Sequence, residues 1–430
     1  GLWWARRRFD RVLARWCLLG VLAALVTPYG WRTIAFPFTL LTRFGEENPF
    51  AQTISEFVSP FALRTLEQFP FYPELPIWTY RILAVLSVFA ALALARRRKT
   101  WMVLLWAGVL VLSAQMLRNV PLFVVAMVPA MAATLSFERV LVWFRMPPRR
   151  RRQVEGSLTA FGLIFALGLG LRVLSNAYYI DTRRLERFGL GWSDLRLPVE
   201  TAAYARSTPV SGAMLNHLNL GGYFMWALPG PVFIDGRLEV VGERFYQEYL
   251  DIFHSEPALE RAVSQYRLGW VVFPFLQEMD LLRRLSKDPR WTLTHMDPIA
   301  VVFVRRGEGV VPASLIVPPT VSSDSLPGLA GRPRDPGWKR WWRGFVKPQE
   351  FPFAEYQRGL FHMIRGEWGL SAGWLAEATR KSGGAYYETY LNLAQVLDQL
   401  GESQLAQEAF RVVLRDDPGN RIARKRLRSP

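Results

Sequence analysis

One arginine stands alone in a long uncharged part of the chain. Arg118 is the only charged residue between Thr100 and Phe137, and it lies in a short turn between two apolar stretches. A guanidinium group in a low-dielectric setting can hold the phosphate of a lipid through paired, charge-assisted hydrogen bonds. The same position also suits an interfacial anchor that contacts lipid headgroups. The sequence therefore leaves two interpretations of Arg118.

A second group of polar side chains lies in residues 232–239, where Asp235 and Arg237 follow a short apolar run. We expect that run to be a strand, and ligands usually bind at the carboxyl ends of strands in open α/β sheets. In the alternative interpretation, Asp235 begins a simple turn in which Arg237 pairs with Glu239 or Glu243.

Residues 220–226 (LGGYFMW) precede this group in the chain. The adjacent glycines Gly221 and Gly222 either allow another part of the backbone to approach closely or form a turn. Tyr223 follows them directly and is a further candidate for ligand binding.

Other groups that could do chemistry are sparse. The chain has a single cysteine, Cys17, which excludes an internal disulfide framework and a multi-cysteine metal site. We find no nucleophile motif, no phosphate-binding glycine loop and no cluster of metal ligands in the sequence. The four histidines lie far apart without ligand spacing, and we expect surface or core positions for His217, His254, His295 and His362. No cofactor is expected from the residues of this chain alone.

A membrane region is the first element that must position these residues. The chain has 430 residues, 50% of them hydrophobic, and a formal net charge of +17. Most of the basic excess lies in residues 1–174, which are also the more apolar part of the chain. This distribution argues against a soluble nucleic-acid-binding protein. The long apolar stretches in this part could also be buried core helices of a large soluble protein. We instead predict about five transmembrane helices within residues 1–180, because five stretches approach the ~20 apolar residues that cross a bilayer: residues 16–31, 75–95, 100–117, 119–137 and 156–180.

Basic loops give the predicted orientation. Arginine-rich segments precede the first stretch, join the second to the third (residues 96–99) and join the fourth to the fifth. The external loop of residues 28–76 and the turn at Arg118 lack such an excess. The positive-inside rule places the basic loops in the cytoplasm, and it places Arg118, residues 28–76 and everything after residue 180 outside. Two further arginines lie near outer ends of the stretches, where long side chains reach the interface: Arg81 and Arg172.

Residues 181–307 are expected to form an external α/β domain. Runs of strand-forming residues alternate with helical patterns, which favours a small, mostly parallel sheet covered by helices. An Asp-Pro pair at residues 297–298 separates the last two strands and predicts a hairpin at the sheet edge. The expected strands are residues 212–215, 231–234, 270–274, 291–296 and 300–305, and the expected helices are residues 243–253, 257–266 and 276–286.

A Pro-rich linker is expected over residues 308–352. An aromatic and basic segment, residues 338–345 (WKRWWRGF), interrupts it. That segment suits either a membrane surface or a docking position on the neighbouring domain.

Residues 353–430 carry a repeat. Gly366 and Gly401 are about one tetratricopeptide (TPR) repeat length of 34 residues apart, and each lies between two apolar helical patterns. We therefore predict a TPR-like pair of helical repeats, packed on the α/β domain or on a partner protein. The second unit matches the pattern at Tyr390, Asn392, Leu393, Gly401, Ala406, Ala409, Phe410, Asp417, Pro418 and Asn420.

This layout resembles the C-terminal half of GT-C superfamily membrane glycosyltransferases. The likeness is closest to a bacterial family-39-like group with a GGY–W segment, an FIDGR segment and trailing TPR repeats, and it covers most of residues 27–420. More distantly, the chain is similar to the oligosaccharyltransferase catalytic subunit. There a TIxE-type motif in a long external loop precedes four final spans and an external mixed domain, and residues 53–56 (TISE) match that motif in position.

The resemblance implies a multi-pass enzyme of the bacterial inner membrane that moves sugar from a polyprenyl-linked donor to an external protein or glycan acceptor. It implies a donor-phosphate role for Arg118 and acceptor-binding roles for Glu56, Tyr223, Asp235 and Arg237. Without the resemblance, Glu56 is an N-cap or an exposed loop residue.

The departures from the family pattern concern catalysis. The acidic catalytic residue of the superfamily lies in the first external loop, and nothing in this sequence matches it. The WWDYG signature of the oligosaccharyltransferase is also absent. We therefore expect this chain to be the C-terminal portion of a longer enzyme, inactive alone, with any divalent metal held mainly by residues outside it.

A different class of protein also fits the sequence. A non-catalytic, membrane-anchored TPR scaffold for envelope assembly would bind protein partners through residues 353–420 and would not bind a lipid-linked sugar. An acidic external loop encoded upstream of Gly1 would favour the enzyme.

Overall fold

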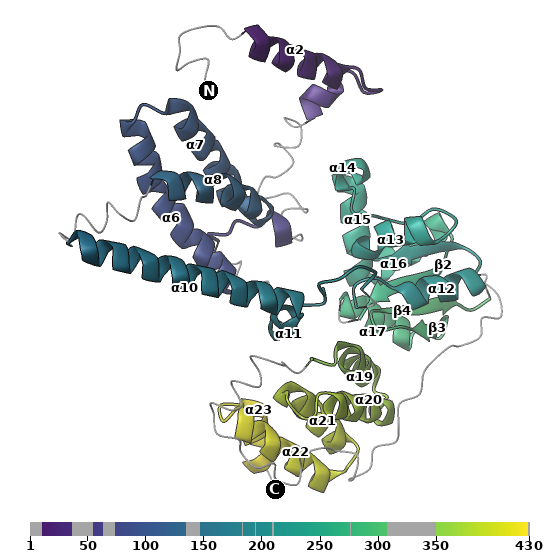
Figure 1. Cartoon of the computed structure of the whole chain (residues 1–430). Helices are drawn as coiled ribbons and strands as arrows, with labels where there is room; N and C mark the ends of the chain where they lie inside the picture. Colours follow the sequence, from purple (N-terminus) through teal and green to yellow (C-terminus); the bar gives the residue numbers. More distant parts are fainter. Residues whose placement is uncertain are drawn as a thin grey trace. The chain divides into compact units, whose positions relative to one another are not determined.

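The computed structural model describes residues 11–36, 55–62, 74–134, 147–182, 184–193, 195–208, 210–275, 277–307 and 350–428 (Figure 1). The chain forms two compact units, Gly1–Phe165 and Ala166–Pro430. Residues 53–54 of the predicted TISE motif lie outside the described residues, as do residues 308–349 of the predicted linker with its aromatic and basic segment.

Helices dominate the first unit, and the first four apolar stretches each overlap one. Their bounds are α2, Arg11–Leu25; α6, Glu74–Arg96; α7, Thr100–Gln115; and α8, Val120–Thr134. Helices α6, α7 and α8 share an apolar core in which Tyr80 meets Phe123 edge-on at 5.4 Å between ring centroids. The Tyr80 hydroxyl also shares a 2.8 Å hydrogen bond with Oγ of Ser113, which ties α6 to α7 where an unpaired hydroxyl would be costly.

Two helices have the length and composition to cross a membrane. They are residues 77–96, which form most of α6, and α10, Pro148–Leu174, whose apolar window no other described residue buries. α7 and α8 are apolar but have 16 and 15 residues, fewer than the ~20 that cross the hydrocarbon core. The chain thus carries helices that indicate membrane association.

A four-stranded mixed sheet forms the centre of the second unit. The strands are β1, Ala213–Asn216; β2, Leu268–Pro274; β3, Trp291–Met296; and β4, Ala300–Arg305, in the order β1-β2-β4-β3. β1 and β2 are parallel, whereas β4 is antiparallel to both β2 and β3. The predicted edge hairpin is confirmed. The predicted mostly parallel sheet is wrong, because the hairpin adds two antiparallel pairings and residues 231–234 form a loop instead of a strand.

Helices cover both faces of this sheet (Figure 1). α12, Val199–Ser207, and α13, Leu218–Ala227, pack on one face in a core with Phe224 and Val302. On the other face, Phe253 of α15 meets Phe273 of β2 at 5.5 Å between centroids. Burial on both faces explains why the inner strands are continuous apolar runs. The remaining helices of this part are α11, Ala177–Asp181; α14, Leu238–Val241; α15, Glu243–His254; α16, Glu256–Tyr266; and α17, Met279–Lys287.

A buried carboxylate fastens α12 to the edge hairpin. Oδ2 of Asp297 accepts hydrogen bonds from the backbone N–H and the hydroxyl of Thr201, at 3.1 and 2.6 Å. Its Oδ1 accepts from the backbone N–H groups of Ile299 and Ala300, both at 2.7 Å. The Asp-Pro pair predicted only as a hairpin turn therefore also satisfies the first turn of a helix.

The C-terminal part is a run of consecutive, mutually packed helices. Gly366 and Gly401, the two predicted turn glycines, both have left-handed backbones, with φ of 74° and 80°. A Cβ at Gly359 would lie 2.6 Å from Cγ of Leu375, so this glycine permits a close helix contact. The helices are α19, Phe353–Arg365; α20, Trp368–Lys381; α21, Tyr387–Gln399; α22, Ser403–Asp416; and α23, Arg421–Arg428.

α19 joins this helical run to the sheet. Phe361 is fully buried, and its ring lies 5.5 Å from that of Phe275 and 6.4 Å from that of Phe303. Packing on the α/β domain, one of the two arrangements expected for the helical run, is therefore confirmed.

Candidate functional site

Two single-turn helices bring distant parts of the first unit together. They are η1, Ser55–Phe57, in the long loop before α6, and η2, Leu117–Asn119, between α7 and α8. The backbone N–H of Leu117 donates to the carbonyl of Val58 at 3.0 Å, and Oγ of Ser59 donates to the carbonyl of Ala114 at 2.7 Å. We call this contact the loop–turn junction.

The loop–turn junction carries two of the predicted site residues. Glu56 lies in η1 and Arg118 in η2, and both side chains are exposed. Neither forms an ion pair or a hydrogen bond with the residues that the structure describes. α6 begins and α7 ends at this junction, so the basic turn of residues 96–99 lies at the opposite ends of these two helices.

Arg81 is a third charged residue at the loop–turn junction. Its Nε donates to the carbonyl of Pro60 at 2.9 Å, and its guanidinium carbon lies 4.8 Å from the ring centroid of Trp78. Its Nη2 is buried and has no hydrogen-bond acceptor among the described residues. The sequence predicted only a side chain that reaches the interface. The signal for a larger role was a single charge inside an apolar helix.

The other predicted site residues belong to the second unit. Nη2 of Arg237 lies 2.6 Å from Oδ2 of Asp235, and its Nε lies 3.0 Å from Oδ1. This hydrogen bond from Arg237 lowers the pKa of the Asp235 carboxyl. The expected strand before this pair is corrected, because residues 231–234 form a loop. Arg237 pairs with Asp235, and its expected pairing with Glu239 or Glu243 stays a prediction.

The GGY–W and FIDGR segments pack against each other. A Cβ at Gly221 would lie 2.0 Å from the carbonyl oxygen of Ile234 and 2.8 Å from Cα of Asp235. Asn216, at the end of β1, donates through Nδ2 to the same carbonyl at 2.8 Å and accepts from the N–H of Phe233 at 2.8 Å. Gly221 therefore serves a close backbone approach inside helix α13, and the interpretation as a turn is wrong.

Residues beyond the carboxyl ends of the parallel strands have shifted pKa values. His217 follows β1 directly, and burial lowers its pKa to about 4. Nδ1 of His217 accepts a hydrogen bond from the N–H of Asn219 at 3.2 Å and so caps α13. Glu278, which precedes α17, has a left-handed backbone (φ 51°), and burial raises its pKa. Burial is the main cause of both shifts. Nothing in the sequence distinguished His217 and Glu278, because burial is decided by the fold.

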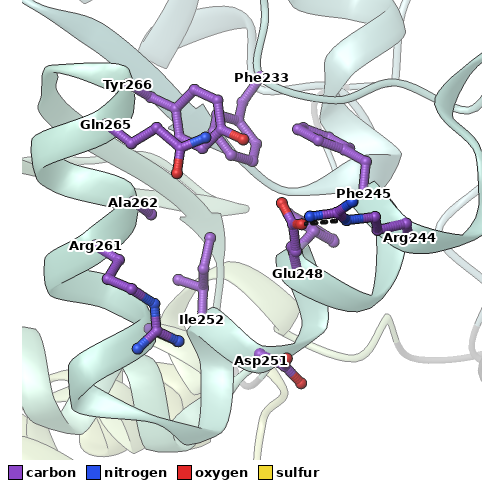
Figure 2. A pocket seen from close by; sticks show the side chains of 12 residues that line it. Phe233, Arg244, Phe245, Glu248, Asp251, Ile252, Arg261, Ala262, Gln265 and Tyr266 are labelled. Atoms are coloured by element: carbon purple, nitrogen blue, oxygen red, sulfur yellow. Dashed lines mark hydrogen bonds and ion pairs between the residues drawn. The ribbon is translucent and has the colours of Figure 1, made fainter.

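A pocket of about 310 Å³ opens between α15 and α16 (Figure 2). Phe233, Phe245 and Tyr266 form an aromatic wall with ring centroids 5.1 to 6.2 Å apart. Figure 2 shows Arg244 paired with Glu248 on one side and Arg261 on the other. Aromatic faces beside hydrogen-bonding groups suit a ring with one apolar face and several hydroxyls, such as a sugar.

Three carboxylates lie close enough to one another to suggest a cation site: Glu256, Glu260 and Asp288. The guanidinium of Arg290 lies among them, with its Nη2 2.7 Å from Glu260 and 2.6 Å from Asp288. Glu256 also contacts Arg284 at 3.4 Å. Arginine charge already balances this group. At the loop–turn junction Glu56 is the one described carboxylate, and a single carboxylate does not form a site for a divalent cation.

Comparison of the chain with protein-family models, with curated proteins and with solved structures finds no match.

Proposed function

We propose that this chain is the C-terminal part of a GT-C-type membrane glycosyltransferase, which transfers sugar from a polyprenyl-linked donor to an external acceptor. The observation that carries the proposal is the loop–turn junction. It holds Arg118, Arg81 and Glu56 at one end of three packed apolar helices, where a lipid phosphate and a water-soluble acceptor could both reach.

In this proposal the two arginines hold the donor. Arg118 is exposed and has no carboxylate partner among the described residues, so its guanidinium is available for a phosphate. The buried Nη2 of Arg81 has no acceptor among the residues that the structure describes, and such a donor gains most from a bound oxygen. The exposed carboxylate of Glu56 accepts a hydrogen bond from an acceptor hydroxyl.

The membrane arrangement is part of the proposal. Five spans, formed by α2, α6, α7, α8 and α10 with their flanking residues, place the loop–turn junction and the second unit on the extracytoplasmic side of the bacterial inner membrane. The arginine-rich segments at the other helix ends support this orientation.

The second unit then serves the acceptor. The pocket between α15 and α16 offers aromatic faces and a polar rim to a glycan. The helical pairs α19–α20 and α21–α22 are TPR-like repeats that position an acceptor or a partner. Tyr266→Ala should weaken binding of an oligosaccharide acceptor, whereas Tyr387→Ala, on α21 outside the pocket, should not.

The experiment that tests the proposal measures sugar transfer by the full-length protein in membranes with a polyprenyl phosphate-linked sugar. Arg118→Ala and Glu56→Gln should each reduce transfer strongly. Arg97→Ala, at the opposite end of the helices, is the matched control and should retain transfer. Wild-type transfer by both Arg118→Ala and Glu56→Gln would refute the assigned roles.

The second candidate function is a non-catalytic envelope scaffold. It is favoured by the helical run itself, because α20 to α23 share one apolar core and the pair α21–α22 repeats the glycine turn of the first pair. Pull-down of a protein partner that depends on residues 353–420, without binding of any lipid-linked sugar, would support it.

A further inference from the structure

An exposed aromatic patch follows α10 in the chain. Trp192 and Trp226 are 65% and 69% exposed, and their ring centroids lie 5.3 Å apart. Tyr223 stands beside both, at 6.4 and 5.8 Å. Leu190 is fully exposed, and Phe188 is half exposed. We call these five residues the aromatic patch.

A glycine-containing loop and helix α13 together form this patch. Leu190 lies between Gly189 and Gly191, and Gly191 has a φ of 130° that L side chains rarely adopt. Trp192 comes from this loop, whereas Tyr223 and Trp226 come from helix α13. Two separate segments thus contribute large rings to one exposed cluster, and such clusters mark interaction surfaces.

A pair of hydrogen bonds ties Phe188, four residues before Trp192 in the same loop, to the end of α10. Oδ1 of Asn176 accepts from the backbone N–H of Phe188 at 2.6 Å, and Nδ2 of Asn176 donates to the carbonyl of Phe188 at 3.3 Å. Asn176 lies two residues after Leu174, the last residue of α10. Two residues of chain reach at most ~7 Å. Phe188 is therefore held near the end of α10, which is long and apolar enough to cross a membrane.

The chemistry of the patch matches the boundary between headgroups and acyl chains. Tryptophan and tyrosine favour this boundary because each joins a large apolar ring to one hydrogen-bonding group. Leu190 and Phe188 add side chains without polar atoms. Arg172, in the last turn of α10, pairs with Asp181 of α11, so the charge at the helix end is balanced.

We infer that the aromatic patch of Phe188, Leu190, Trp192, Tyr223 and Trp226 inserts into the surface of the bilayer that α10 crosses. The occupant of the patch is lipid. This contact holds the α/β domain against the membrane beside the exit of α10. The inference depends on insertion of α10 but not on sugar transfer.

Site-specific fluorescence in vesicles tests this inference. With Cys17→Ser as background, single cysteines are introduced by Leu190→Cys in the patch, Leu163→Cys in the exposed apolar part of α10 and Leu400→Cys at the end of α21. Each is labelled with an environment-sensitive fluorophore. The chain is reconstituted in phosphatidylethanolamine–phosphatidylglycerol vesicles with and without brominated acyl chains. All three positions are exposed, so the substitutions should not disturb folding.

The inference predicts that brominated lipid quenches the labels at positions 163 and 190 and leaves the label at position 400 unchanged. Quenching at 163 without quenching at 190 would overturn the inference. A label at 190 that is shielded from water yet unquenched would assign the patch to a protein partner, and would also overturn it. Absence of quenching at 163 would remove its premise, the insertion of α10.

Discussion

The backbone N–H of Leu117 donates a 3.0 Å hydrogen bond to the carbonyl of Val58. This bond joins the turn between α7 and α8 to a loop that precedes α6. Arg118 follows Leu117 directly, and Glu56 lies two residues before Val58. Both side chains are charged and exposed. Two polar groups that the sequence separates by two helices thus share one end of the apolar bundle, and the proposed donor site depends on this arrangement.

Gly221 and Gly222 form a matched pair for the packing of α13. Gly221→Ala should destabilise the second unit by ~1–3 kcal/mol, because its Cβ would meet backbone atoms of Ile234 and Asp235 that have no room to move. Gly222→Ala, whose Cβ would meet nothing within 4 Å, should instead stabilise the helix by ~0.5–1 kcal/mol. Denaturant unfolding of both variants checks this prediction, and equal effects would contradict it.

Phe361 is expected to hold the helical run to the sheet. Phe361→Ala should cost ~3–5 kcal/mol, because the ring is fully buried between Phe275 and Phe303. Limited proteolysis should then separate the helical run from the α/β domain. Leu370→Ala, at a partly exposed position of α20, is the control and should leave the digestion pattern unchanged. A wild-type pattern for Phe361→Ala would show that other contacts hold the two parts together.

His217 should make the second unit sensitive to acid. Burial lowers its pKa from 6.5 to about 4, so the unfolded chain binds a proton that the folded chain does not bind between these values. The contribution of neutral His217 to stability is complete above pH 6.5 and is lost as the pH falls toward 4. Protonation would also remove the acceptor that caps α13 and place a cation at a helix N-terminus.

The variant His217→Asn separates the cap from the charge. Asparagine is a good N-cap and does not titrate. In this variant the free energy of unfolding should therefore lose the part of its fall between pH 6.5 and 4 that protonation of His217 causes. An unchanged profile for His217→Asn would mean that other groups cause the acid sensitivity.

Periodicity predicted the elements whose local pattern decides their structure. β3 and β4 have the predicted bounds, and α15, α16 and α17 lie within three residues of theirs, because strand-forming runs and amphipathic helices are local signals. The glycines at 366 and 401 were predictable for the same reason, since a left-handed turn needs glycine. The parallel or antiparallel pairing of strands was not, because it depends on contacts between distant segments.

The candidate sites show the same division. Arg118 was recognisable as a lone charge in an apolar region, and Glu56 through a family resemblance. The sequence predicted that Arg81 lies near the outer end of its stretch, but not its bond to Pro60, because that bond forms only when the loop folds back. The Gly221-Gly222 pair left two interpretations open in the sequence, a close backbone approach or a turn. Only the folded chain decides for the close approach, because Ile234 and Asp235 come from a distant loop.

Direct binding of a polyprenyl phosphate is the measurement that tests the central claim. The chain, reconstituted in lipid nanodiscs, should bind polyprenyl phosphate, and Arg118→Ala or Arg81→Ala should reduce this affinity by at least about tenfold, the ~1.4 kcal/mol expected from loss of one charge-assisted hydrogen bond. Arg97→Ala, at the opposite end of α6, should bind as the wild type does. Equal affinity of all four proteins, or no binding by the wild type, would contradict a donor-phosphate site at the loop–turn junction.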